Sequence, residues 1–162
     1  ENPMAGWKVL SDCLHVGGLM KIGLYSELAR QQVVKIRDEI KKSNINSNDD
    51  EMRSFRGEIV RSEKEHHKFV TLISDFYSLS TYRDLLFHVQ EHRFTIPQIK
   101  DCLDQLGLVF CGFQDPKIVQ KFKTQNRAEN SLYDLDKWNE FEKENPNIFL
   151  GMYLFWCQKY NK

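Results

Sequence analysis

The densest group of residues able to do chemistry is the segment HVQEH, from His88 to His92. With Glu91 it fits the H-x-x-E-H pattern of a class of zinc peptidases, in which two histidines one helical turn apart bind the metal and the glutamate acts as base. Such a site needs a third protein ligand, and neither Glu129 nor Glu140 is marked by any pattern. Because five residues match easily by chance, zinc hydrolysis is the least favoured interpretation.

The same histidines have two further interpretations. They could line a substrate pocket and move a proton, since the imidazole pKa lies near neutral pH. Alternatively, they are solvated groups at the end of a surface helix, and the sequence leaves these two interpretations open. The other pair, His66 and His67, lies among Lys64, Glu65 and Lys68, a charged context that predicts a solvent-facing position.

Three strands are predicted from apolar runs. The runs at 19–25 and 108–113 are apolar on both faces, as in buried central strands. The aromatic run near the C-terminus suits a helix face or a strand, and we favour a strand at 152–159. A helix, a glycine turn and a buried strand occur twice, over 3–25 and 95–113, which indicates an α/β sheet.

Helices are predicted where apolar residues recur at helical spacing. Ser26 is expected to cap one whose apolar stripe continues to Ile40, and Asp49 or Asp50 is expected to cap the next. The clearest signal is Thr95-Ile96-Pro97-Gln98, a capping box with proline in the first turn, in a helix that Gly107 ends. Further helical stripes are predicted at 3–14, at 69–76, after Asp115 and around Trp138 and Phe141.

Composition narrows the functional classes. Lysine plus arginine and aspartate plus glutamate both total 23, so no net field argues for nucleic acid or an anionic membrane surface. The sequence shows no 18-residue apolar run and no secretory signal pattern. Its four cysteines never occur at CxxC spacing, which favours buried thiols in the cytoplasm. A length of 162 residues predicts one domain, 1–162.

Longer stretches carry a resemblance. ENPMAGWKVLSDCLHVGGLMKIGLYS resembles the part of class I S-adenosylmethionine-dependent methyltransferases that follows the fourth strand. RDLLFHVQEHRFTIPQI, GLVFCGF and DLDKWNEFEKENPNIFLGMYLFWCQK are similar to distal blocks of bacterial methyltransferase domains often found with tetratricopeptide repeats. Together these segments span nearly the whole chain, which therefore looks like the C-terminal half of such an enzyme.

The resemblance implies a partial Rossmann-like sheet in which the last strand lies antiparallel between the other two. Residues 27–87 would be a helical insertion on the substrate side. The cofactor-binding motifs would precede Glu1, so S-adenosylmethionine is expected in the parent protein, and the isolated chain is expected to bind none and to be inactive. No cofactor-binding or metal residue is assigned to this chain.

We expect the substrate side at the C-terminal end of the first strand, where ligands collect in open α/β sheets. The candidate residues there are Tyr25, Ser26, His88, Glu91 and His92. A sheet without its first strands exposes an edge, which predicts a homodimer or larger assembly. The alternative to a methyltransferase fragment is a noncatalytic, helix-rich interaction domain, and the methyl acceptor is not identified by the sequence.

Overall fold

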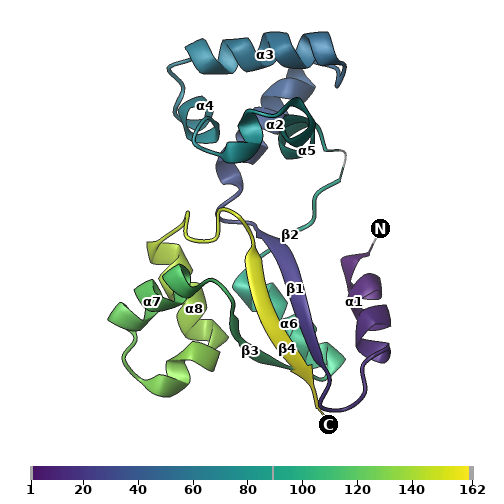
Figure 1. Ribbon diagram of the computed structural model, residues 1–162, viewed down its shortest axis with the longest axis vertical. Coiled ribbons are helices and arrows are strands. Elements are labelled where there is room, and N and C mark those ends of the chain that lie inside the picture. The colour runs from purple at the N-terminus through teal and green to yellow at the C-terminus, as the bar shows by residue number, and fades with distance from the viewer. Residues whose placement is uncertain (1, 89, 161–162) are drawn as a thin grey trace. The chain divides into compact units, whose positions relative to one another are not determined.

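The computed structural model describes residues 2–88 and 90–160 (Figure 1). The chain forms two compact units, each with its own hydrophobic core. The sheet unit comprises Glu1–Ala29 and His92–Lys162, and the helical unit comprises Arg30–Glu91. The predicted helical insertion at 27–87 overlaps the helical unit. The assignment of the whole chain to one domain remains a prediction.

A mixed sheet of four strands forms the centre of the sheet unit (Figure 1). Its order is β2 (Arg93–Phe94), β1 (Leu19–Ser26), β4 (Tyr153–Lys159) and β3 (Leu108–Phe113). Because β4 is antiparallel to both neighbours, β1 and β3 are parallel to each other. The three predicted strands are confirmed, including the ambiguous C-terminal run and its position between the other two. The short β2 was not predicted.

The register of the sheet is interrupted at one place. Phe110 lies opposite Cys157, whereas Gly112 lies opposite Trp156, so Cys111 is an extra residue in β3. Gly112 has a φ of 119°, a backbone conformation that residues with a side chain rarely adopt. The glycine therefore permits the bulge that the two flanking pairs require.

Helices cover the sheet, and their predicted ends are confirmed where the capping signal was strongest. Thr95 and Gln98 form both hydrogen bonds of the capping box, and Gly107 ends that helix with a φ of 65°. Asp115 accepts hydrogen bonds from the first turn of the next helix. The helices of this unit are α1 (Pro3–Asp12), α6 (Ile96–Leu106), α7 (Pro116–Gln125) and α8 (Leu135–Glu144), with a 3-10 turn at Glu129–Tyr133.

Aromatic side chains dominate the core of the sheet unit. Phe113 contacts the rings of Trp138, Phe149 and Phe155. Trp138 in turn stacks on Phe122 at 3.7 Å, with 13° between the ring planes. These contacts bring α7, α8 and the bulged end of β3 into one cluster, and each ring adds a large buried apolar area.

The helical unit corrects three expectations. Ser26 does not cap a helix, because a turn follows it and the first helix begins at Gln31. The cap of the next helix is Asn48, whose side chain accepts a hydrogen bond from the Glu51 amide. The stripe at 69–76 is not one helix, and Leu72 is 82% exposed. The elements are α2 (Gln31–Lys42), α3 (Asp49–Arg61), α4 (Glu65–Val70), a 3-10 turn at Ser74–Phe76 and α5 (Leu79–Phe87).

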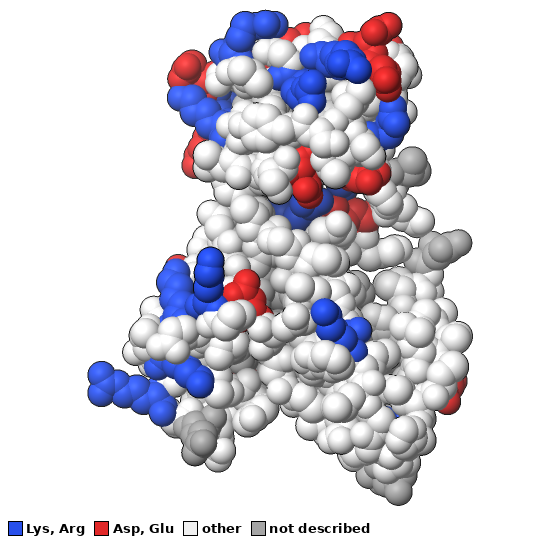
Figure 2. All heavy atoms as spheres, viewed as in Figure 1, with Lys and Arg blue, Asp and Glu red and all other residues white. Residues whose placement is uncertain are grey.

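Basic and acidic side chains are intermixed on the face of the helical unit that Figure 2 shows. This face therefore has no electrostatic potential of one sign. This agrees with the equal totals of acidic and basic residues in the sequence. Within the described part of the chain, no helix is long and apolar enough to cross a membrane.

Two glycine substitutions should have opposite effects. Gly107→Ala should lower the free energy of unfolding by about 1 kcal/mol, because alanine is strained at positive φ whatever the space around its Cβ. Gly6→Ala, in α1 with nothing near its added Cβ, should raise it by about 0.5–1 kcal/mol. Urea denaturation of both variants checks this, and a stabilising Gly107→Ala would contradict the left-handed helix end.

Candidate functional site

The C-terminal end of β1 is held by a buried polar cluster. Ser26 Oγ donates a hydrogen bond to Glu142 Oε1 at 2.6 Å and accepts one from the Ala29 amide at 3.0 Å. The Tyr153 hydroxyl lies 2.6 and 2.7 Å from the two oxygens of the same carboxylate. The cluster therefore joins the last residue of β1, helix α8 and the first residue of β4.

The Glu142 carboxyl group is buried. Among the described residues, no cationic side chain contacts it. Its residue is 3% exposed, and burial raises the pKa of Glu142. The hydrogen bonds from Ser26 and Tyr153 favour the carboxylate and oppose the effect of burial. Burial also raises the pKa of Tyr153, so this phenol remains a donor. Ser26 is thus engaged in a closed structural cluster rather than facing a ligand.

Tyr25 and the residues beside it form a more accessible polar group. Tyr25 is half-buried and lies opposite Arg93 in the parallel pairing of β1 with β2. The Arg93 guanidinium donates to Glu27 Oε2 at 2.9 Å, and both side chains are partly exposed. Partly exposed charged groups therefore lie at the carboxyl end of β1, the end of a strand where ligands bind in open α/β sheets.

His92 lies on a shallow pocket of about 330 Å³ in the sheet unit. The pocket lies beside β2 and α6, where Asp101 and Cys102 contribute to its wall. Sequence analysis identified His92 but not its neighbours, because the pocket depends on a strand of only two residues. Of the predicted site residues, His92 is the one that contributes to this pocket.

His88 and Glu91 have other environments. Helix α5 ends at Phe87, so His88 is an exposed helix cap with extended backbone and does not share a helix face with His92. The side chain of Glu91 is 4% exposed and accepts hydrogen bonds from Arg30, at 2.5 and 3.3 Å, and from Arg37, at 3.0 Å. The helical scaffold that the H-x-x-E-H interpretation requires is therefore absent from the described segment around these residues, and Glu91 acts as the centre of an ion-pair cluster.

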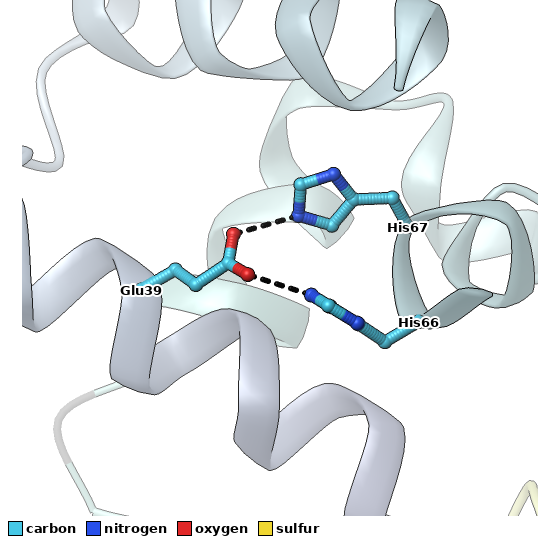
Figure 3. Close-up of side chains that lie close together, drawn as sticks. All are labelled: Glu39, His66 and His67. Atoms are coloured by element: carbon cyan, nitrogen blue, oxygen red, sulfur yellow. Dashed lines mark hydrogen bonds and ion pairs between the residues drawn. The ribbon is translucent and has the colours of Figure 1, made fainter. Parts of the chain in front are cut away.

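His66 and His67 do not face solvent, contrary to the prediction. His66 Nε2 lies 2.7 Å from Glu39 Oε1, and His67 Nε2 lies 2.8 Å from Glu39 Oε2 (Figure 3). His67 is buried, and its ring also meets Phe55 edge-on. Lysine and glutamate neighbours in sequence suggested exposure, but α4 is short and packs on α2 through this pair.

The electrostatics of this cluster favour an ionised carboxylate and a neutral imidazole. Burial would raise the pKa of Glu39, but its hydrogen bonds with the two histidines and Lys64 outweigh burial and lower that pKa to about 2. Burial lowers the pKa of His67, and the Glu39 carboxylate offsets part of this effect. His67 Nδ1 is buried without a hydrogen-bond partner among the described residues.

Three residues of these clusters were missed by sequence analysis. Glu142 follows Phe141 and lies four residues after Trp138, so a charge on the apolar face of α8 was a usable signal. Glu39 lies beside the apolar stripe of α2, and no local pattern pairs it with histidines 27 and 28 residues away. Tyr153 was assigned to a strand but not to a hydrogen-bonding role.

Tyr153→Phe should lower the free energy of unfolding by about 1–3 kcal/mol at pH 7, because a hydrogen bond to a buried carboxylate is lost. The loss should be smaller below pH 4.5, the pKa of an unperturbed glutamate, where Glu142 is protonated in folded and unfolded protein. Urea denaturation at pH 7 and pH 4 measures this difference. Tyr133→Phe, at an exposed phenol, is the control, and equal losses of Tyr153→Phe at both pH values would contradict the assignment.

A comparison of the chain with models of known protein families finds no match. Function must therefore be inferred from the strand order and from the polar groups described above. The accessible groups near the end of β1 are Tyr25, Glu27, Arg93 and the pocket that includes His92. The enclosed groups, Ser26 with its Glu142 partner and Glu91 with its two arginines, serve the structure.

Proposed function

We propose that this chain is the distal part of a class I S-adenosylmethionine-dependent methyltransferase. The observation that carries the proposal is the strand order, in which β1 and β3 are parallel and β4 runs antiparallel between them. This is the arrangement that the sequence resemblance implies for the end of a methyltransferase sheet. The helical unit between β1 and β2 also agrees with the insertion expected from the resemblance.

The chain's own glycine turn does not fit the cofactor. The Gly17 amide donates to the Lys159 carbonyl at 2.8 Å, and the Gly18 amide donates to the His15 carbonyl at 2.9 Å. Because both amides have backbone acceptors, they cannot also hold the anionic group of a ligand. In the proposal, S-adenosylmethionine is therefore bound by upstream residues of the parent protein, and this chain alone is inactive.

The contribution of this chain would be to bind and orient the methyl acceptor. Methyl transfer depends strongly on alignment of the attacking atom with the reacting carbon, so residues that only position a substrate still matter for the rate. Tyr25 and His92 are the proposed contacts. Tyr25 lies at the carboxyl end of β1, and His92 directly precedes β2 and lines the shallow pocket there. The chemical class of the acceptor is not specified by these groups.

A noncatalytic interaction domain is the second candidate. Leu19 to Leu24 of β1 pair with β4 on one side, and no described strand pairs with them on the other. Four apolar residues at the start of this unit are exposed: Val9, Leu10, Val16 and Leu19. An open strand edge and exposed apolar side chains suit association with another polypeptide. We propose that, when no other partner is present, a second copy of the chain binds this edge.

The proposed compartment is the cytoplasm. Its support is that the four cysteines are free thiols, of which Cys102 and Cys157 are buried. Localisation of the intact parent protein would test this proposal.

Calorimetric titration with S-adenosylmethionine tests the enzyme proposal. We expect no saturable binding by the 162-residue chain, and saturable binding by the protein that the complete natural gene encodes. Absence of binding by the complete protein would contradict the methyltransferase assignment and favour the interaction domain. Binding by the 162-residue chain would contradict the upstream placement of the cofactor site.

Leu19→Lys should reduce self-association of the chain. Leu19 begins the open edge of β1 and is 57% exposed, so a lysine there opposes strand pairing without removing a core side chain. Light scattering should give a dimer or larger particle for the unchanged chain and a smaller mass for the variant. Leu72→Lys, at an exposed leucine of the helical unit, is the matched control, and a monomeric unchanged chain would contradict the expectation.

A further inference from the structure

We propose that Glu39, His66 and His67 form a binding site for a transition-metal dication, of which Zn²⁺ is the best candidate. One ligand atom from each residue is available, and these three atoms all lie within 4.8 Å of one another (Figure 3). Two imidazole nitrogens and a carboxylate oxygen form a donor set that binds zinc in proteins, and imidazole donors disfavour Mg²⁺ and Ca²⁺.

The present distances are close to those of a metal site. Zinc bonds of about 2.0–2.1 Å in tetrahedral geometry place neighbouring ligand atoms about 3.3 Å apart. The two nitrogen to oxygen distances are 2.7 and 2.8 Å, so each must lengthen by roughly half an ångström to admit the ion. The Glu39 side chain is 28% exposed, so we expect its rotation to supply most of this change.

The orientation of the two rings supports the proposal. Both histidines direct Nε2 at the same carboxylate, although they are consecutive residues of one helix (Figure 3). The rings are 4.6 Å apart and nearly perpendicular, with an angle of 72° between their planes. The two Nε2 atoms can therefore both reach one ion once their protons have left them.

The Glu39 carboxylate fixes the present tautomer of His67, because a carboxylate only accepts hydrogen bonds and Nε2 must therefore carry the proton. In many metal sites a second hydrogen bond holds the proton on the nitrogen opposite the metal. Metal binding at Nε2 requires the proton there to move to Nδ1, which is buried without a hydrogen-bond partner among the described residues, so the metal-bound tautomer gains no supporting hydrogen bond. The same absence of a supporting hydrogen bond should make this site weaker than a structural zinc site.

Lys64 is the group that competes with the metal. Its ammonium lies 3.0 Å from Glu39 Oε1, and its side chain is 56% exposed. A dication and an ammonium cannot share one carboxylate oxygen without strong repulsion, so Lys64 must move into solvent when the metal binds. Removal of this charge should therefore tighten metal binding, the opposite of what loss of a ligand does.

Titration of the tag-free chain with Zn²⁺ by calorimetry, and with Co²⁺ by visible absorption, tests the proposal. We expect one equivalent to bind, with the absorption bands of tetrahedral or five-coordinate cobalt and a rise in melting temperature. Glu39→Gln and His66→Gln should each weaken binding at least 10-fold. Lys64→Met should tighten it several-fold, and all three variants should keep their helical circular dichroism.

The double variant His88→Gln/His92→Gln is the matched control, because it also removes two histidines but lies outside the cluster. Its zinc affinity should stay within about two-fold of the unchanged chain. Three results would overturn the proposal: no binding below millimolar zinc, unchanged affinity in both Glu39→Gln and His66→Gln, or loss of binding in the double variant. The last result would instead indicate a site at the H-x-x-E-H segment. If Glu39→Gln fails to fold, His66→Gln and Lys64→Met still decide the question.

Discussion

Strand β4 forms hydrogen bonds along both of its edges, and the organisation of the sheet unit depends on this pairing. Leu19 to Leu24 lie along one edge, and β3, more than 80 residues later in the sequence, lies along the other. Since β1 and β3 have no direct pairing in the sheet order, removal of β4 would separate them. The last strand of the chain therefore closes contacts between its first and middle segments, which makes folding of this unit dependent on long-range pairing.

Two buried glutamates illustrate different ways to enclose a carboxylate. Glu91 is surrounded by the guanidinium groups of Arg30 and Arg37, so its charge has opposite charges nearby. Among the described residues, Glu142 is hydrogen-bonded by the hydroxyl groups of Ser26 and Tyr153, and its pKa is raised by burial. Such clusters fix geometry more than they add stability, because the cost of desolvation offsets much of the attraction. Glu142 joins the last residue of β1 to the first residue of β4, and Glu91 joins Arg30 and Arg37 within the helical unit.

Sequence reasoning succeeded where the signal is local. Apolar runs predicted β1, β3 and β4, and the residues Thr95 and Gly107 gave the ends of α6, because caps act through neighbouring backbone groups. Strand β2 was missed because its two residues become a strand only through pairing with Tyr25 and Ser26. Glu142 lies 116 residues from its partner Ser26, and His66 and His67 lie 27 and 28 residues from Glu39, so no local pattern connects them. The histidine pair at 66 and 67 was assigned to solvent for the same reason.

The segment Arg30–Glu91 begins and ends at one place. Its first and last residues are joined directly by the Arg30 to Glu91 ion pair. In the sheet unit, the residues that flank the segment are also neighbours, since Ser26 pairs with Phe94 and the Glu27 amide donates to the Phe94 carbonyl. An element whose ends meet can be gained, lost or exchanged as a cassette with little effect on the sheet that carries it. A short linker in its place would leave the backbone path of the sheet nearly unchanged, so evolution could alter the helices independently of the sheet.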